Sequence, residues 1–117
     1  LRSSAASDVY KRQVNIPFPP GSSGALMRQK YKAFVFPALQ KFKPELILIS
    51  AGFDAHEADP LAELNWSTED FSWLTERLCQ IASDYCEGRL VSILEGGYDL
   101  EALAESVKAH VMKLCEA

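Results

Sequence analysis

Two short stretches of this chain carry side chains that could do chemistry. The first covers residues 52–61 and contains Asp54, His56, Glu57 and Asp59. Carboxylates and imidazoles are ordinary ligands of zinc and related metal ions. Side chains of the same types also cap turns or face water in many loops, so residue type alone leaves both interpretations open.

The second stretch, residues 95–100, places Gly96 and Gly97 directly before Tyr98. Glycines permit tight turns and a close approach of a substrate to the backbone. A phenol at that point could donate a hydrogen bond to a developing oxyanion. The stretch could instead be a turn followed by an interface tyrosine, or a phosphate-binding loop. It lacks the full Gly-x-Gly-x-x-Gly spacing of a dinucleotide-binding loop.

Each stretch follows a continuous apolar run, at residues 46–51 and 90–94. These runs are too short for helices and show no polar alternation, which favours buried strands of a parallel sheet. Ligands of an open parallel sheet bind beyond the carboxyl ends of its strands. A right-handed crossover makes the two strands neighbours, so we expect the two loops to converge on one site.

Apolar residues at spacings of three and four predict helices over residues 25–42, after Ser67 and after Asp99. Pro37 lies inside the first helix and predicts a kink or a new turn. Ser67 resembles the start of a capping box, and Asp99 can cap the last helix. With a short strand at residues 14–16, the predicted order alternates strand and helix. That order is typical of an α/β domain with a parallel sheet.

Composition excludes some functions. The net charge of -4 argues against a broad basic surface for nucleic acid. No apolar run reaches the roughly 18 residues of a membrane span, and no signal peptide is visible. Three cysteines without a Cys-x-x-Cys pair favour a reducing, intracellular compartment such as the cytoplasm, or the nucleus in a eukaryote. We expect residues 1–13, which lack apolar periodicity, to be a disordered or foreign tail.

Three motifs make the chain resemble a known family. Residues 48–56, with Asp59-Pro60-Leu61, resemble the third metal motif of histone deacetylases and acetylpolyamine amidohydrolases. Residues 94–100 resemble the catalytic tyrosine motif of that family, in a Glu-Gly-Gly-Tyr form similar to the class II branch and its bacterial relatives. Asn15-Ile16-Pro17 is similar to the strand before the active-site loop. The resemblance implies that residues 14–117 are the C-terminal part of a three-layer deacetylase domain of arginase/deacetylase type.

The resemblance also implies roles for individual residues. Asp54 would bind Zn²⁺, and Tyr98 would polarise the acetyl carbonyl and stabilise the tetrahedral intermediate. Asp59 would order its loop, and His56 is not expected to be a ligand because only the aspartate of this motif binds metal. The wall of a narrow channel for acetyl-lysine or acetylpolyamine would include Pro60, Leu61, Gly96 and Gly97.

The chain departs from the family because it lacks the other ligands and the His-His pair. Its only histidines, His56 and His110, lie in neither motif, and we expect His110 at the surface or boundary of the last helix. We therefore expect the chain alone to be inactive, and to expose apolar surface where further strands are missing. Two alternatives remain open: a Rossmann-like cofactor domain using Gly96-Gly97, and a non-catalytic interaction module with the deacetylase fold.

Overall fold

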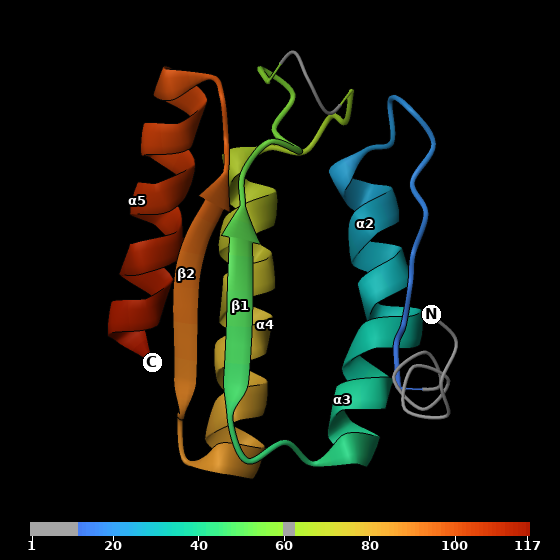
Figure 1. The fold of residues 1–117 in the computed structure, drawn as a ribbon, viewed down its shortest axis with the longest axis vertical. Helices are drawn as coiled ribbons and strands as arrows, with labels where there is room; N and C mark the ends of the chain where they lie inside the picture. The colour runs from blue at the N-terminus through green and yellow to red at the C-terminus, as the bar shows by residue number, and fades with distance from the viewer. Residues whose placement is uncertain (1–11, 60–62) are drawn as a thin grey trace, which may run out of the picture.

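The computed structural model describes residues 12–59 and 63–117, and most of the predicted tail at residues 1–13 lies outside them. Figure 1 shows two strands side by side, with helices packed alongside them. The strands are parallel, and the chain between them forms a helix, so the predicted α/β class is confirmed. The elements are, in chain order, α2 (Gly24–Lys30), the π-helix η1 (Tyr31–Val35), α3 (Phe36–Phe42), β1 (Ile47–Gly52), α4 (Thr68–Cys86), β2 (Leu90–Gly96) and α5 (Leu100–Glu116).

The two strands are neighbours, as the sequence predicts. Ile47 lies opposite Leu90, and the register holds until an irregularity after Ala51. There Gly52 pairs with Gly96, and one residue of β2 is skipped. The bulge therefore places two glycines next to each other where both strands end.

Side-chain caps start α4 and α5 where the sequence predicts them, and a third cap starts α2. Ser67 accepts a hydrogen bond from the backbone N–H of Asp70, and the Asp70 carboxylate accepts one from the N–H of Ser67. These two bonds confirm the capping box. Asp99 caps α5 by accepting from the N–H of Ala102, and Ser23 caps α2 in the same way through the N–H of Leu26.

The irregularity predicted at Pro37 is confirmed, and it takes the form of a π-helix. Residues 31–35 widen into η1, and the N–H of Phe36 bonds to the carbonyl of Tyr31. Pro37 then lies in the first turn of α3, directly after the π-helix. Lys43 ends α3 in the left-handed conformation, with φ of 55°.

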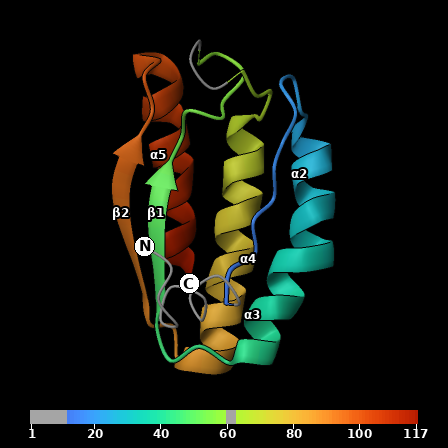
Figure 2. The same ribbon diagram turned by 45° about the vertical axis from the view of Figure 1, so that its right-hand side comes forward.

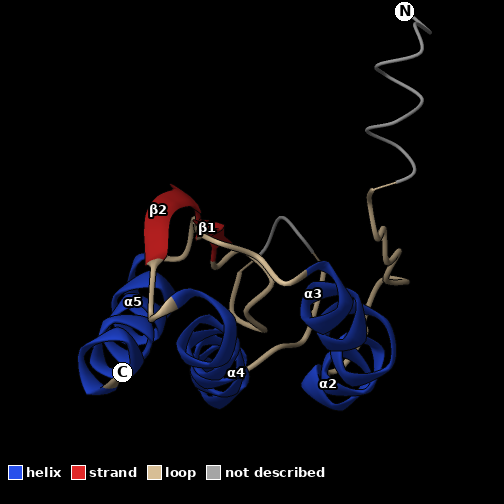
Figure 3. Cartoon of the chain, turned by 90° about the horizontal axis from the view of Figure 1, so that it is seen from below, coloured by secondary structure: helices blue, strands red, loops and turns tan. Residues whose placement is uncertain are grey.

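All the helices lie on one side of the sheet, as Figures 2 and 3 show. Ile47 and Ala51 face the helices and are buried, whereas Leu48 on the opposite face is 67% exposed and Ile93 is 61% exposed. The prediction of fully buried strands is therefore wrong for one face. Successive strand side chains point to opposite faces, and no described residue covers the second one. The exposed apolar side chains on this face agree with the expectation that the chain exposes apolar surface.

The strand predicted at residues 14–16 is also wrong, because the described chain is irregular there. Pro17 follows at once, and the short segment finds no strand to pair with among the described residues. The core lies instead between the helices and the sheet. One cluster gathers around Phe53, Trp66 and Phe71, and the other around Phe36 and Ile81.

Candidate functional site

A hollow of about 280 Å³ lies at the carboxyl ends of β1 and β2. The structure brings Asp54, which follows β1, and Tyr98, which follows β2, into this one hollow. Asp54 is half-buried, whereas Tyr98 is 58% exposed. The predicted convergence of the two loops is thus present, and the remaining lining consists of Ser50, Gly52, Glu95 and Gly96.

Glycines make room for the Asp54 carboxylate and for the turn after β2. A Cβ on Gly52 would lie 3.3 Å from Asp54 Oδ1, and one on Gly96 would lie 3.5 Å from the same atom. Gly97 has φ of +140°, and a Cβ there would lie 2.7 Å from Leu103 Cδ1. Gly52 therefore leaves room for the carboxylate at the end of β1, whereas a Cβ on Gly96 would make an ordinary van der Waals contact with it. Gly97 lets the loop pack on α5.

His56 points away from the hollow and uses both ring nitrogens elsewhere. Its Nδ1 accepts a hydrogen bond from the N–H of Ala58 at 3.1 Å. The ring proton is then on Nε2, which donates to Thr68 Oγ1 at 3.2 Å. Both ring nitrogens of His56 are thus engaged by Ala58 and Thr68.

Asp59 is buried and reaches the second loop. Its Oδ2 accepts from the backbone N–H of Tyr98 at 2.8 Å and from that of Asp99 at 3.2 Å. Pro60 and Leu61, the other predicted channel residues, lie outside the described residues. Their role in a channel wall remains a prediction.

The described residues do not complete a zinc site. No group of three or more histidine, cysteine or acidic side chains among them could hold a metal ion. A catalytic zinc ion takes three protein ligands, and besides Asp54 the lining of the hollow offers one other side chain of these types, Glu95. Asp54 can therefore contribute one ligand but cannot hold zinc by itself.

His110 corrects the sequence analysis, because it is buried and only 6% exposed. Thr75 Oγ1 donates to the carbonyl of Phe71, so it accepts from His110 Nδ1–H at 2.7 Å. His110 Nε2 then accepts from the Ser92 hydroxyl at 2.8 Å. Burial lowers the pKa of His110 from its ordinary value, which favours this neutral form.

The buried face of α5 is made of small and polar residues. The buried stripe of α5 consists of Ala102, Ser106 and His110, spaced four residues apart. Leu100 and Val111 belong to the apolar residues whose spacing predicts this helix, yet they are 80% and 46% exposed. The signal for the buried face is thus the four-residue spacing of small and polar residues, which apolar periodicity does not include.

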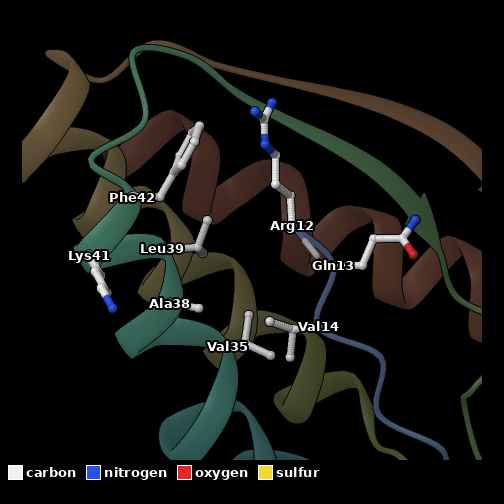
Figure 4. A pocket seen from close by; sticks show the side chains of 8 residues that line it. All are labelled: Arg12, Gln13, Val14, Val35, Ala38, Leu39, Lys41 and Phe42. Carbon is white, nitrogen blue, oxygen red and sulfur yellow. The ribbon is translucent and has the colours of Figure 1, made fainter. Parts of the chain in front are cut away.

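A larger hollow, of about 730 Å³, lies between residues 12–14 and α3 (Figure 4). Its lining is mainly apolar, with Arg12 and Lys41 as its charged members. It contains neither a carboxylate nor a phenol, and it is separate from the hollow that Asp54 and Tyr98 share. The smaller hollow therefore remains the candidate site.

Comparison with known proteins identifies the class that this fold and site define. The histone deacetylase domain family matches residues 2–114. Histone deacetylase 10, chloroplastic, from Oryza sativa subsp. japonica is 48% identical over 94 residues, which are 80% of this chain and 21% of that protein. The histone deacetylase-like amidohydrolase of Pseudomonas aeruginosa is 38% identical over 85 residues, 73% of this chain and 22% of that protein.

A solved structure agrees with this assignment. The crystal structure of the HDA15 HD domain aligns with a TM-score of 0.77 and 33% identity, covering 86% of this chain and 28% of that one. The chain belongs to the histone deacetylase family. It spans about a fifth of the length of the two curated relatives above. In the described part of the chain, no helix is long and apolar enough to cross a membrane.

Proposed function

We propose that this chain forms part of the active site of a zinc-dependent deacetylase, which hydrolyses acetyl amides of lysine side chains or polyamines to the free amine and acetate. The observation that carries the proposal is the shared hollow of Asp54 and Tyr98. Relatives named as deacetylases and amidohydrolases support the reaction class. Because the chain spans only part of their length, we assign the activity to a longer protein.

In this proposal Tyr98 is the catalytic residue that this chain supplies. Its phenol has no hydrogen-bond partner among the described residues and is exposed at the hollow. It is therefore free to donate to the acetyl carbonyl oxygen and to the oxyanion that replaces it. A donor of this kind contributes about 100-fold to 1000-fold in rate.

Asp54 would provide one zinc ligand, and the others would come from outside the described residues. Gly96 and Gly97, with Pro60 and Leu61, would line the channel that admits the acetylated side chain. All three cysteines are unpaired, which supports a reducing compartment such as the cytoplasm or nucleus.

The cofactor-binding alternative finds no support in the loop after β2. A phosphate cradle needs free backbone N–H groups at a helix N-terminus. Here the Asp99 carboxylate takes the N–H of Ala102, and the Asp59 carboxylate takes those of Tyr98 and Asp99. Carboxylates thus already fill the positions that a phosphate would need.

Hydrolysis of an acetyl-lysine peptide tests the proposal. With added zinc the chain alone should show no rate, because its ligand set is incomplete. In the longer protein that carries this chain, Tyr98→Phe should lower kcat about 100-fold with little change in KM. Tyr85→Phe, which alters an exposed phenol on α4, should leave both constants unchanged. Hydrolysis by the chain alone, or a full rate in Tyr98→Phe, would contradict the proposal.

A further inference from the structure

A carboxylate bridge joins the two loops of the site. Asp59 Oδ2 accepts two consecutive backbone N–H groups, from Tyr98 at 2.8 Å and from Asp99 at 3.2 Å. Asp59 is only 5% exposed, so these bonds are largely shielded from water. Hydrogen bonds from N–H groups to an ionised acceptor are about twice as strong as neutral ones.

The Asp59 end of the bridge is anchored through its own loop. The N–H of Asp59 donates to the carbonyl of His56 at 2.9 Å. Two further bonds tie this loop to the segment before α4: the N–H of Glu57 donates to Trp66, and the N–H of Trp66 donates to Ala55. The carboxylate is thus presented from a part of the chain that is already fixed.

At the Tyr98 end, the carbonyl of Gly96 accepts from the N–H of Phe53 at 2.8 Å, whereas the N–H groups of Tyr98 and Asp99 donate to Asp59. The phenol of Tyr98 is exposed. Gly97, which precedes it with φ of +140°, has no side chain that could restrain it. Asp99 after it uses its own side chain to cap α5. The backbone bonds to Asp59 therefore fix the direction in which the Tyr98 side chain leaves the loop.

We propose that Asp59 is a positioning residue, whose carboxylate holds the backbone at residues 98 and 99 so that the phenol of Tyr98 faces Asp54 across the hollow. This inference rests on the proposed function. It means that the orientation of the catalytic phenol depends on a residue 39 positions earlier in the chain. A displacement of about 1 Å at a reacting group can cost about 100-fold in rate. Loss of the bridge should therefore act on catalysis through Tyr98.

The bridge itself can be tested without any activity. Hydrogen exchange of the Tyr98 and Asp99 amides should accelerate at least tenfold in Asp59→Ala, and less in Asp59→Asn, which keeps an acceptor oxygen of the same shape. Asp84→Asn, at an exposed carboxylate near the end of α4, should leave both amides unchanged. If Asp59→Ala does not fold, Asp59→Asn provides the measurement. Unchanged exchange of both amides in the folded variants would overturn the proposal.

Catalysis in the longer protein tests the consequence. Asp59→Ala should lower kcat about 10-fold to 100-fold while KM stays within about threefold, and Asp59→Asn should restore part of the loss. Combining Asp59→Ala with Tyr98→Phe should cost little more than Tyr98→Phe alone, because both changes act through one phenol. Fully multiplicative losses would overturn the proposal. A full rate in Tyr98→Phe would instead refute the proposed function, and amide exchange would still report on the bridge.

Discussion

Gly97 shows how a residue without a side chain shapes the site. Its φ of +140° is one that other residues rarely adopt, and the space where a Cβ would lie is taken by Leu103 on α5. Both constraints act on the residue directly before Tyr98. The turn before Tyr98 therefore depends on glycine for two separate reasons, one in the backbone and one in packing.

A matched pair of substitutions separates these two reasons. Gly88 also has a positive φ, of +77°, but a Cβ there would meet nothing within 4 Å. We expect Gly88→Ala to lower the free energy of unfolding by about 1 kcal/mol, from backbone strain alone. Gly97→Ala should cost about 1 to 3 kcal/mol more, because it adds the overlap with Leu103. Urea unfolding curves measure both, and equal losses would show that the Leu103 contact is irrelevant.

His110 gives the fold a dependence on pH. Burial lowers its pKa, so the unfolded chain takes up a proton at this residue before the folded chain does. The stability that neutral His110 contributes is fully present above its unfolded pKa of about 6.5, and it is lost as the pH falls below that value. The protonated ring could no longer accept the bond from Ser92.

The urea concentration at the unfolding midpoint should therefore decrease as the pH is lowered from 7 to 5. It should decrease less steeply in His110→Gln. Unfolding in acid has other contributions besides His110, so the difference in slope between the two proteins is the diagnostic quantity. His56→Gln serves as the control and should keep most of the wild-type slope, because His56 is only partly buried. Parallel curves for wild type and His110→Gln would rule out this role.

Among the elements, α2 and α4 are joined through the carboxylate of Asp70. Asp70 Oδ1 accepts from Arg28 Nε at 2.9 Å, while its Oδ2 accepts from the N–H of Ser67 at 2.8 Å. Gly24, the first residue of α2, lies directly against this carboxylate, and a Cβ there would overlap it. One side chain thus caps α4 and fixes how closely α2 approaches it.

Gly24→Ala should consequently lower the free energy of unfolding by about 2 kcal/mol, since the added methyl group displaces the Asp70 carboxylate. The loss should be smaller when Gly24→Ala is made in an Asp70→Ala background, where the overlapping group is gone. A double-mutant cycle from chemical denaturation measures this coupling. Additive losses would mean that the two residues do not interact.

At the scale of the whole molecule, one apolar face of the sheet is uncovered. Leu48 and Ile93 are mostly exposed on it, whereas Ile47, next to Leu48 in β1, is buried against the helices. An exposed apolar sheet of this kind favours self-association. The same strand therefore contributes to the core through one face and is exposed to association through the other.

Two alanine substitutions in β1 test this division. Leu48→Ala should reduce self-association of the chain, as seen by sedimentation velocity, with a change in unfolding free energy below about 1 kcal/mol. Ile47→Ala should cost about 2 to 4 kcal/mol, because it opens a cavity in the core. If Leu48→Ala leaves self-association unchanged, the uncovered face does not drive it.

Local chemistry made much of the fold predictable from the sequence. Residues close together in the sequence determine the caps at Ser67 and Asp99, the interruption at Pro37 and the two strands. These features can therefore be predicted without a structure. The motifs around Asp54 and Tyr98 likewise identified the family, and the order of the elements placed their loops at one edge of the sheet.

Only the tertiary structure decided the features that depend on which elements pack together. The burial of His110 requires Thr75 and Ser92, which come from α4 and β2. The bonds from Asp59 to the second loop join residues 39 and 40 positions apart, and no local pattern encodes that distance. Periodicity shows that a strand has two faces, but whether each is covered depends on the other elements present.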